Sequence, residues 1–180
     1  MLSRLLLVLG VLALSAACKP SAPPLTAAPS PNAPSGQVVA PVSDLAPELT
    51  IETLEGRTFR LSEQRGRPVV LFFTASWCAS CIPEIGTLNR LYELYRDQGL
   101  QIVVVSIDPG DTPADLQRFK ALAKGADYVW GLDRGGRALL DYQVTALETK
   151  VVVGRDGRIV ARHVGRELFE AAKAAVESAL

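Results

Sequence analysis

The sequence predicts an α/β fold with a central mixed sheet flanked by helices. Two apolar runs, residues 68–74 and 101–108, are continuous and rich in β-branched residues, as is typical of strands buried on both faces. Apolar residues at three- and four-residue spacing follow each run, so helices should alternate with these strands. Two further strands at 150–153 and 158–163 flank a Gly-Arg-Asp-Gly turn, and this hairpin should complete the sheet.

The N-terminal segment is typical of an export signal. Arg4 supplies a positive charge, residues 5–14 are almost entirely apolar, and small residues precede Cys18. The apolar run is shorter than the roughly 20 residues that span a bilayer, so we expect a signal peptide over residues 1–17. Residues 14–18, Leu-Ser-Ala-Ala-Cys, resemble a bacterial lipobox, in which the cysteine thiol is diacylated and becomes the mature N-terminus. The alternative is an ordinary cleavable signal with a stray cysteine.

Residues 18–46 are expected to be a tether between the lipidated Cys18 and a folded domain at 47–180. The segment is rich in Pro, Ala and Ser and shows no periodic apolar face, so it should not bury a core. The whole protein would then be a bacterial lipoprotein, anchored on the periplasmic side or at the cell surface. Either type of signal places the domain outside the cytoplasm, where disulfides persist.

Within the domain, a hairpin of strands at 49–54 and 58–61 comes first. After Trp77 and Cys78 a helix should run to about residue 98, where Gly99 is a suitable C-terminal stop. The next helix should begin with Thr112 as N-cap and Pro113 in its first position. The remaining elements are a short strand at 128–130, a short helix at 137–142 and a terminal helix at 167–180.

Cys78 and Cys81 lie where a buried strand ends and a helix is expected to begin. The first N–H groups of a helix are unpaired and its dipole is positive there, so the pKa of a thiol at this place falls below about 8.5. Ala79 and Ser80 between the cysteines let the two sulfurs meet across one turn. We expect Cys78 to be the attacking thiol and Cys81 the thiol that resolves a mixed disulfide.

Three other interpretations of the cysteine pair were weighed: a static structural disulfide, half of a zinc site, and two core thiols. Zinc lacks further ligands, because Cys18 is assigned to the lipid and His163 is the only histidine. The CxxC motif comes after a buried strand, is preceded directly by Trp77 and opens a helix. This placement favours redox activity. We therefore expect no metal, and no cofactor other than the Cys78–Cys81 redox disulfide.

Residues 45–180 resemble the membrane-tethered thioredoxin-like family that includes the TlpA and ResA proteins. The features that match are Trp-Cys-Ala-Ser-Cys at 77–81, Glu84, the helix inserted after Asp108, Tyr-Gln-Val at 142–144, and the strand and turn at 151–157. The resemblance implies a thioredoxin-like fold with an N-terminal β-hairpin and an inserted helix. It also implies disulfide exchange with exported cysteine-containing proteins, often an apocytochrome c or a copper-site protein. Trp77 would shape the surface that the partner approaches.

The chain departs from the family pattern around the cysteines. Ser80 replaces the usual proline before the second cysteine, and Phe72 stands where thioredoxins often bury an aspartate. At the position of the family's cis-proline is Glu148, followed by Thr149; a non-proline cis bond costs about 3–4 kcal/mol, so we expect a trans peptide. These two residues would line the wall opposite Trp77. Our hypothesis is that the Glu148 carboxylate accepts or relays the proton of Cys81; the alternative is a solvated loop carboxylate.

The expected function is thus that of an extracytoplasmic thiol–disulfide oxidoreductase, supplied with electrons by a thiol-transferring membrane protein if it is a reductant. Nineteen basic and nineteen acidic residues give no net charge and no reason to expect nucleic acid as a partner.

A thioredoxin-like copper chaperone is the first alternative, because residues 108–113 resemble a loop of Sco-type chaperones and thiolates suit Cu(I). Those proteins use a CxxxC pair and a distant histidine, whereas His163 is expected on the surface. A peroxidase would need threonine where Ala75 stands. The third alternative is a tethered domain with a structural disulfide.

Overall fold

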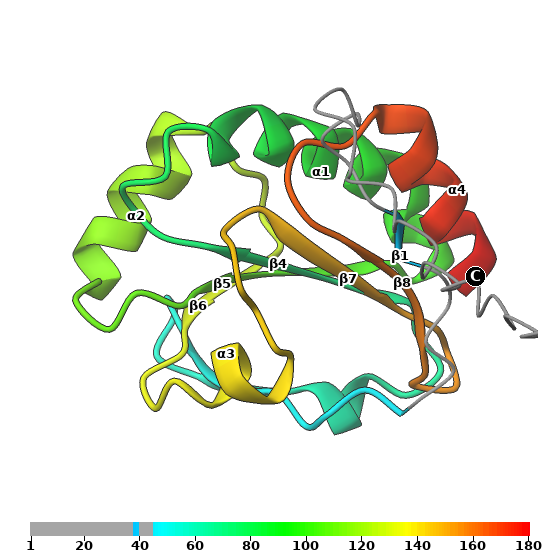
Figure 1. The fold of residues 1–180 in the computed structure, drawn as a ribbon, viewed down its shortest axis with the longest axis horizontal. Coiled ribbons are helices and arrows are strands. Elements are labelled where there is room, and N and C mark those ends of the chain that lie inside the picture. Colours follow the sequence, from blue (N-terminus) through cyan, green and yellow to red (C-terminus); the bar gives the residue numbers. More distant parts are fainter. Residues whose placement is uncertain (1–37, 40–44) are drawn as a thin grey trace, which may run out of the picture. The chain divides into compact units, whose positions relative to one another are not determined.

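The computed structural model describes residues 38–39 and 45–180, and an eight-stranded mixed sheet forms its centre (Figure 1). The predicted signal peptide, Cys18 and all of the expected tether except residues 38–39 and 45–46 lie outside the described residues. The strands are β1 Val38–Val39, β2 Thr50–Thr53, β3 Thr58–Arg60, β4 Val69–Thr74, β5 Gln101–Ser106, β6 Val129–Leu132, β7 Thr149–Val153 and β8 Ile159–His163. Their spatial order is β1-β8-β7-β4-β5-β6-β2-β3. This architecture confirms the predicted α/β class.

Helices cover both faces of the sheet. They are α1 Cys81–Tyr95, α2 Pro113–Leu122, α3 Arg137–Asp141 and α4 Phe169–Ala179, with short 3₁₀ helices η1 Leu61–Gln64 and η2 Arg96–Gln98. In Figure 1, α1, α2 and α4 lie over one face, and α3 lies over the other. Each layer has its own apolar core: Ile85, Leu116 and Val176 belong to the first, and Leu61 and Tyr142 to the second.

The central strand β4 carries the site. It pairs in parallel with β5 and antiparallel with β7, and all six of its residues are buried. A strand covered on both faces has no use for alternating polar residues, which is why its sequence is continuously apolar. β4 ends at Thr74, so residues 75–80 leave the sheet at the edge where α1 begins. The cysteine motif is therefore held by a strand whose residues are all buried.

Two predicted helix ends agree with the structure. Thr112 caps α2, where its hydroxyl accepts a hydrogen bond from the Asp115 N–H while the Asp115 carboxylate accepts from the Thr112 N–H. Gly99 follows η2 directly and has a φ of 92°, a left-handed conformation that ends the helical segment formed by α1 and η2.

The start of α1 differs from the prediction. The helix begins at Cys81 rather than directly after Cys78. The N–H of Cys78 donates to the carbonyl of Ala75, and the N–H of Cys81 donates to the carbonyl of Cys78. These two successive turns, which periodicity alone does not reveal, carry the chain from β4 into the helix. Cys78 consequently lies just before the first helical turn.

The edge beyond β8 contains structure that the sequence did not predict. Val38 and Val39 pair with His163 and Arg162 of β8, within the segment expected to be a tether. His163 is 6% exposed, so the prediction that it lies on the surface is wrong. The reason is that β8 is flanked by β1 and β7 and therefore is not an edge strand. In the described part of the chain, no helix has both the length and the apolar character needed to cross a membrane.

Candidate active site

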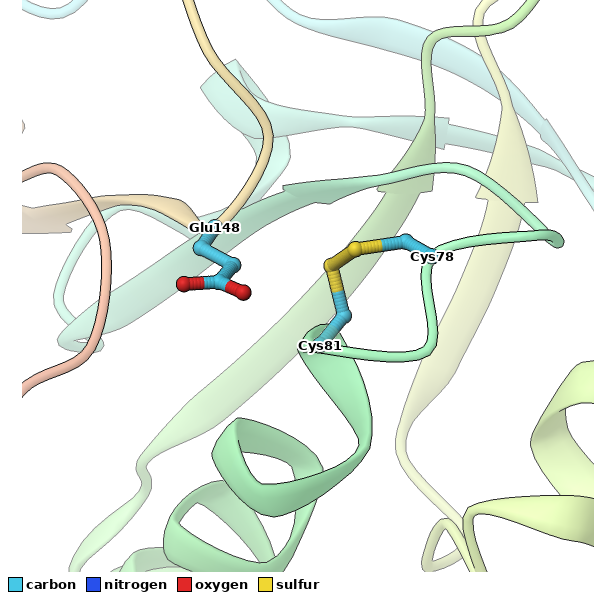
Figure 2. A group of neighbouring side chains, drawn as sticks. All are labelled: Cys78, Cys81 and Glu148. Carbon is cyan, nitrogen blue, oxygen red and sulfur yellow. A yellow bond between two sulfur atoms is a disulfide. The ribbon is translucent and has the colours of Figure 1, made fainter.

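Cys78 and Cys81 form a disulfide at the junction between β4 and α1 (Figure 2). Their Cα atoms are 5.4 Å apart. Cys81 is completely buried as the first residue of α1, whereas Cys78 retains 4% exposure. Ala79 and Ser80 between them are exposed, and the Ser80 Oγ lies 3.5 Å from the Cys78 Sγ. Cys78 is therefore the sulfur that an incoming thiolate or disulfide can reach, and Cys81 lies behind it at the positive end of α1.

The loop before Cys78 is fastened to the loop that follows β5. Ser76 donates two hydrogen bonds to the buried Asp111 carboxylate, from its N–H to Oδ2 over 2.7 Å and from its hydroxyl to Oδ1 over 2.6 Å. The Ser106 hydroxyl also donates to Asp111. Sequence reasoning treated residues 108–113 as a connection and missed this role. The one available signal was a pair of aspartates directly after a buried strand.

Trp77 projects from the same loop and is 67% exposed. Its indole Nε1 donates to Asp108 Oδ2 over 2.6 Å, which fixes the ring against the loop that follows β5. This bond, followed by one from the Gly110 N–H, holds the pKa of Asp108 below its ordinary value. A large exposed ring that is held by a charge-assisted hydrogen bond can serve as a rigid contact for a partner.

Glu148 faces the disulfide from the loop that leads into β7 (Figure 2). A carboxylate oxygen of Glu148 and the sulfurs of Cys78 and Cys81 all lie within 4.8 Å of one another. Its N–H donates to the Phe73 carbonyl over 3.0 Å, and no peptide bond among the described residues is cis. The structure thus brings the carboxylate to the sulfurs from the start of the neighbouring strand β7, while its role in proton transfer stays a prediction.

The backbone around Glu148 holds it in an uncommon conformation. Its φ is 64°, a left-handed value that costs a non-glycine residue about 1–2 kcal/mol. Such residues persist where the surroundings determine the backbone, often at functional sites. Thr149, which was expected to line the site, is fully buried, and its hydroxyl donates to the Ala146 carbonyl over 2.7 Å. Thr149 therefore shapes the loop, and the side chain of Glu148 is the group presented to the sulfurs.

A cluster of buried charges lies behind the motif, and sequence reasoning did not predict it. Lys150 forms an ion pair with Glu84 of α1, and its Nζ is 3.7 Å from Glu167 Oε2. Both Lys150 and Glu84 side chains are 3% exposed. Burial raises the pKa of Glu167, although Lys150 and His163 act in the opposite direction. The Lys150 Nζ also lies 5.7 Å from the centre of the Phe72 ring. Phe72 stands where thioredoxins often bury an aspartate, so the Lys150 ammonium group lies next to that position.

The sequence matches the family model described as AhpC/TSA over residues 42–162, which is more than half of the chain. The chain belongs to the AhpC/TSA family. The match begins in the segment before β2 and ends in β8, so it includes both cysteines, Asp111 and Glu148.

Individual relatives of this AhpC/TSA member carry the name ResA, as the predicted resemblance to TlpA/ResA-like proteins implies. "Thiol-disulfide oxidoreductase ResA" of Geobacillus thermodenitrificans is 32% identical over 118 residues, which cover 66% of this chain and 66% of that protein. The chain thus matches just under two thirds of the length of that relative. The predicted resemblance is confirmed.

Solved structures support the same fold. A crystal structure assigned to the thiol:disulfide interchange protein DsbE of Chlorobium tepidum superposes with a TM-score of 0.70 and is 26% identical, covering 78% of this chain and 99% of that one. The thioredoxin domain of a thiol-disulfide oxidoreductase from Bacteroides vulgatus has a TM-score of 0.67 at 24% identity, covering 77% and 99%. The predicted thioredoxin-like fold is confirmed.

Proposed function

We propose that this protein is an extracytoplasmic thiol–disulfide oxidoreductase that exchanges the Cys78–Cys81 disulfide with cysteine pairs of exported proteins. The observation that carries the proposal is the disulfide itself, which lies between a buried strand and a helix N-terminus with one sulfur nearer to solvent. The names of the ResA and DsbE relatives support the same reaction. Apocytochromes c and copper-site proteins are the first partners to test.

The reaction in the reducing direction needs two displacements. The Cys78 thiolate attacks a substrate disulfide, forms a mixed disulfide and releases one substrate thiolate. The Cys81 sulfur then loses its proton and attacks Cys78, which restores the Cys78–Cys81 disulfide and releases the second substrate thiolate. Two electrons pass from this protein to the substrate, and a thiol-transferring membrane protein would return them by reducing Cys78–Cys81. The oxidising direction is the reverse of these steps.

Glu148 is the candidate acceptor for the proton of Cys81. Its carboxylate is the acidic group that lies within 4.8 Å of both sulfurs, and its half-buried position leaves a path to solvent. A base at this place can take the proton of Cys81 as its sulfur attacks Cys78, which speeds the second displacement. Glu148→Gln should therefore slow resolution of the mixed disulfide and change its pH profile; an unchanged profile would remove this role.

Equilibration with glutathione redox buffers tests the main proposal. A reversible two-electron transition is expected, near about −270 mV for a reductant or nearer −120 mV for an oxidant. Cys81→Ser should accumulate mixed disulfides with exported proteins, while Cys78→Ser should accumulate far fewer, because the exposed sulfur is lost. A disulfide that stays oxidised across the whole series, together with no trapped partner, would favour the structural-disulfide alternative and overturn the proposal.

We also propose that Cys18 carries the lipid that holds the protein at the membrane. The support is the lipobox-like sequence at residues 14–18 and the Pro-rich stretch after it. Two or three acyl chains suffice for stable anchoring. Mass spectrometry of the N-terminal peptide should show a diacylated Cys18, and Cys18→Ala should release the protein from membranes. A mature N-terminus without acyl groups would contradict this assignment.

A further inference from the structure

We infer that the reduced protein has a zinc site formed by Cys78, Cys81 and Glu148. In the described part of the chain, the two sulfurs and a carboxylate oxygen of these residues lie within 4.8 Å of one another, which is close enough to hold one metal ion. Two of the three donors belong to the redox pair, so the site exists only when the disulfide is open. The inference does not depend on which protein exchanges disulfides with the pair.

The donor set is suited to zinc. Zn²⁺ binds cysteine sulfur at about 2.3 Å and carboxylate oxygen at about 2.0–2.2 Å, with tetrahedral geometry. In that geometry a sulfur and an oxygen ligand are about 3.6 Å apart, so the Glu148 carboxylate needs to approach by only about 1 Å. A glutamate side chain covers that distance by rotation of its torsion angles, without movement of the backbone.

The choice of metal rests on Glu148. Cu(I) prefers soft sulfur ligands and would gain little from a carboxylate, whereas Zn²⁺ accepts sulfur and oxygen together. The one histidine, His163, lies outside the group: its Nε2 is 3.0 Å from the Arg166 carbonyl oxygen. A site with two thiolates and one carboxylate leaves the fourth position of a tetrahedral ion for water, as in open zinc sites.

The surrounding structure holds the donors in place. Cys81 is fixed in the first turn of α1, and the Glu148 N–H is bound to the Phe73 carbonyl of β4. The Ser80 hydroxyl, 3.5 Å from the Cys78 sulfur, can donate to that sulfur once it is a metal-bound thiolate. Outer hydrogen bonds of this kind orient ligands and support metal affinity.

Metal binding requires that the disulfide is first reduced. In the experiment below the reductant is a phosphine: with one water molecule it converts the disulfide to two thiols and becomes the phosphine oxide. Zn²⁺ then displaces the two thiol protons and coordinates Glu148 in its ionised form. Since both thiolates are ligands, bound zinc prevents Cys78 from attacking a disulfide, and it favours the reduced over the oxidised state by mass action.

The test measures zinc affinity directly. Full-length protein in detergent is reduced with a phosphine, desalted without oxygen, and titrated with Zn²⁺ against a chromophoric chelator, after a thiol assay has counted the available sulfurs. The reduced protein should bind one Zn²⁺ per chain and the oxidised protein none. Glu148→Gln should weaken binding at least about tenfold, as loss of even an outer partner commonly does. Glu55→Gln, which changes an exposed carboxylate in the β2–β3 turn, is the matched control and should bind as the unaltered protein does.

Two further measurements separate the ligands. Co²⁺ in place of Zn²⁺ should show sulfur-to-metal charge-transfer absorption that weakens in Cys81→Ser, and its d–d bands should shift in Glu148→Gln. Cu(I) affinity should be the same in the Glu148→Gln variant and the unaltered protein. Absence of zinc binding by the reduced protein, or equal zinc affinity with and without the Glu148 carboxylate, would overturn the inference; so would binding of Cu(I) alone.

Discussion

Replacing Lys150 with methionine tests how the buried charges behind the disulfide are balanced. The side chains of Lys150 and Glu84 are both 3% exposed, and they form a direct ion pair between β7 and α1. Glu167 lies 3.7 Å from the same ammonium group. Lys150→Met keeps most of the side-chain volume but leaves Glu84 and Glu167 as buried carboxylates. Among the described residues, His163 is the basic side chain that remains within ion-pair distance of one of them, with its Nδ1 3.6 Å from Glu167.

The cost can be worked from the chemistry of a buried carboxylate. Removal of one partner from a buried pair typically costs about 3–5 kcal/mol. The stranded group can escape this penalty by taking up a proton, and a carboxyl group of ordinary pKa, about 4.3, costs about 3.7 kcal/mol to protonate at pH 7. At pH 5 the same step costs about 1 kcal/mol. We therefore expect Lys150→Met to lose about 4 kcal/mol of unfolding free energy at pH 7 and about 1 kcal/mol at pH 5.

The sign follows from proton linkage. In the variant the folded state binds a proton that the unfolded state releases above about pH 4.3, so the variant loses stability relative to the parent as the pH rises from 5 to 7. Glu84→Gln should cost less than Lys150→Met, because Lys150 keeps Glu167 as a partner. The double variant should recover about 1–3 kcal/mol relative to the sum of the single changes.

Urea unfolding of the oxidised protein at pH 5, 6 and 7 measures these differences. Lys173→Met is a suitable control, since its ion pair with Glu177 lies on the solvent-exposed surface of α4 and its loss should change the unfolding free energy far less. A loss under about 1 kcal/mol at pH 7 for Lys150→Met, or a loss that does not change with pH, would refute the reasoning. Either result would mean that water reaches the carboxylates.

Three further substitutions test contacts in the loops and strands around the site. Trp77→Phe removes the indole donor, so the pKa of Asp108 should rise toward its ordinary value in a carboxyl-carbon NMR titration. An unchanged pKa of Asp108 would contradict the assigned hydrogen bond. Thr112→Ala removes the N-cap of α2 and should cost about 1 kcal/mol of unfolding free energy in urea, whereas no loss would mean that the cap is dispensable. Gly131→Ala places a Cβ 2.5 Å from the Glu52 carbonyl oxygen on the neighbouring strand β2. Urea unfolding should show a loss of about 1–3 kcal/mol in unfolding free energy. Unchanged stability would mean that β2 and β6 can move apart freely.

The sequence alone determined the features that depend on neighbours along the chain. The continuous apolar run of β4, the cap at Thr112 and the stop at Gly99 are local patterns, and each agrees with the structure. The position of Cys78 and Cys81 after a buried strand is also local, which is why the redox pair could be proposed before any fold was known. The exact start of α1 was missed, because two tight turns precede it.

Tertiary structure decided which distant residues meet the sulfurs and which charges lie behind them. Glu148 is far from Cys78 in sequence and reaches it because β7 pairs antiparallel with β4, in a register that aligns Thr149 with Phe73. The same pairing buries Lys150 against Glu84 of α1, and the crossover after β5 brings Asp111 to Ser76. Periodicity predicts that a strand exists but not its neighbour or its register, since these are set by packing across the whole sheet. The chemistry of the cysteine pair was therefore predictable from local sequence, and the family resemblance placed Glu148 near it. The buried Lys150–Glu84 pair and the Asp111–Ser76 contact depend on tertiary packing.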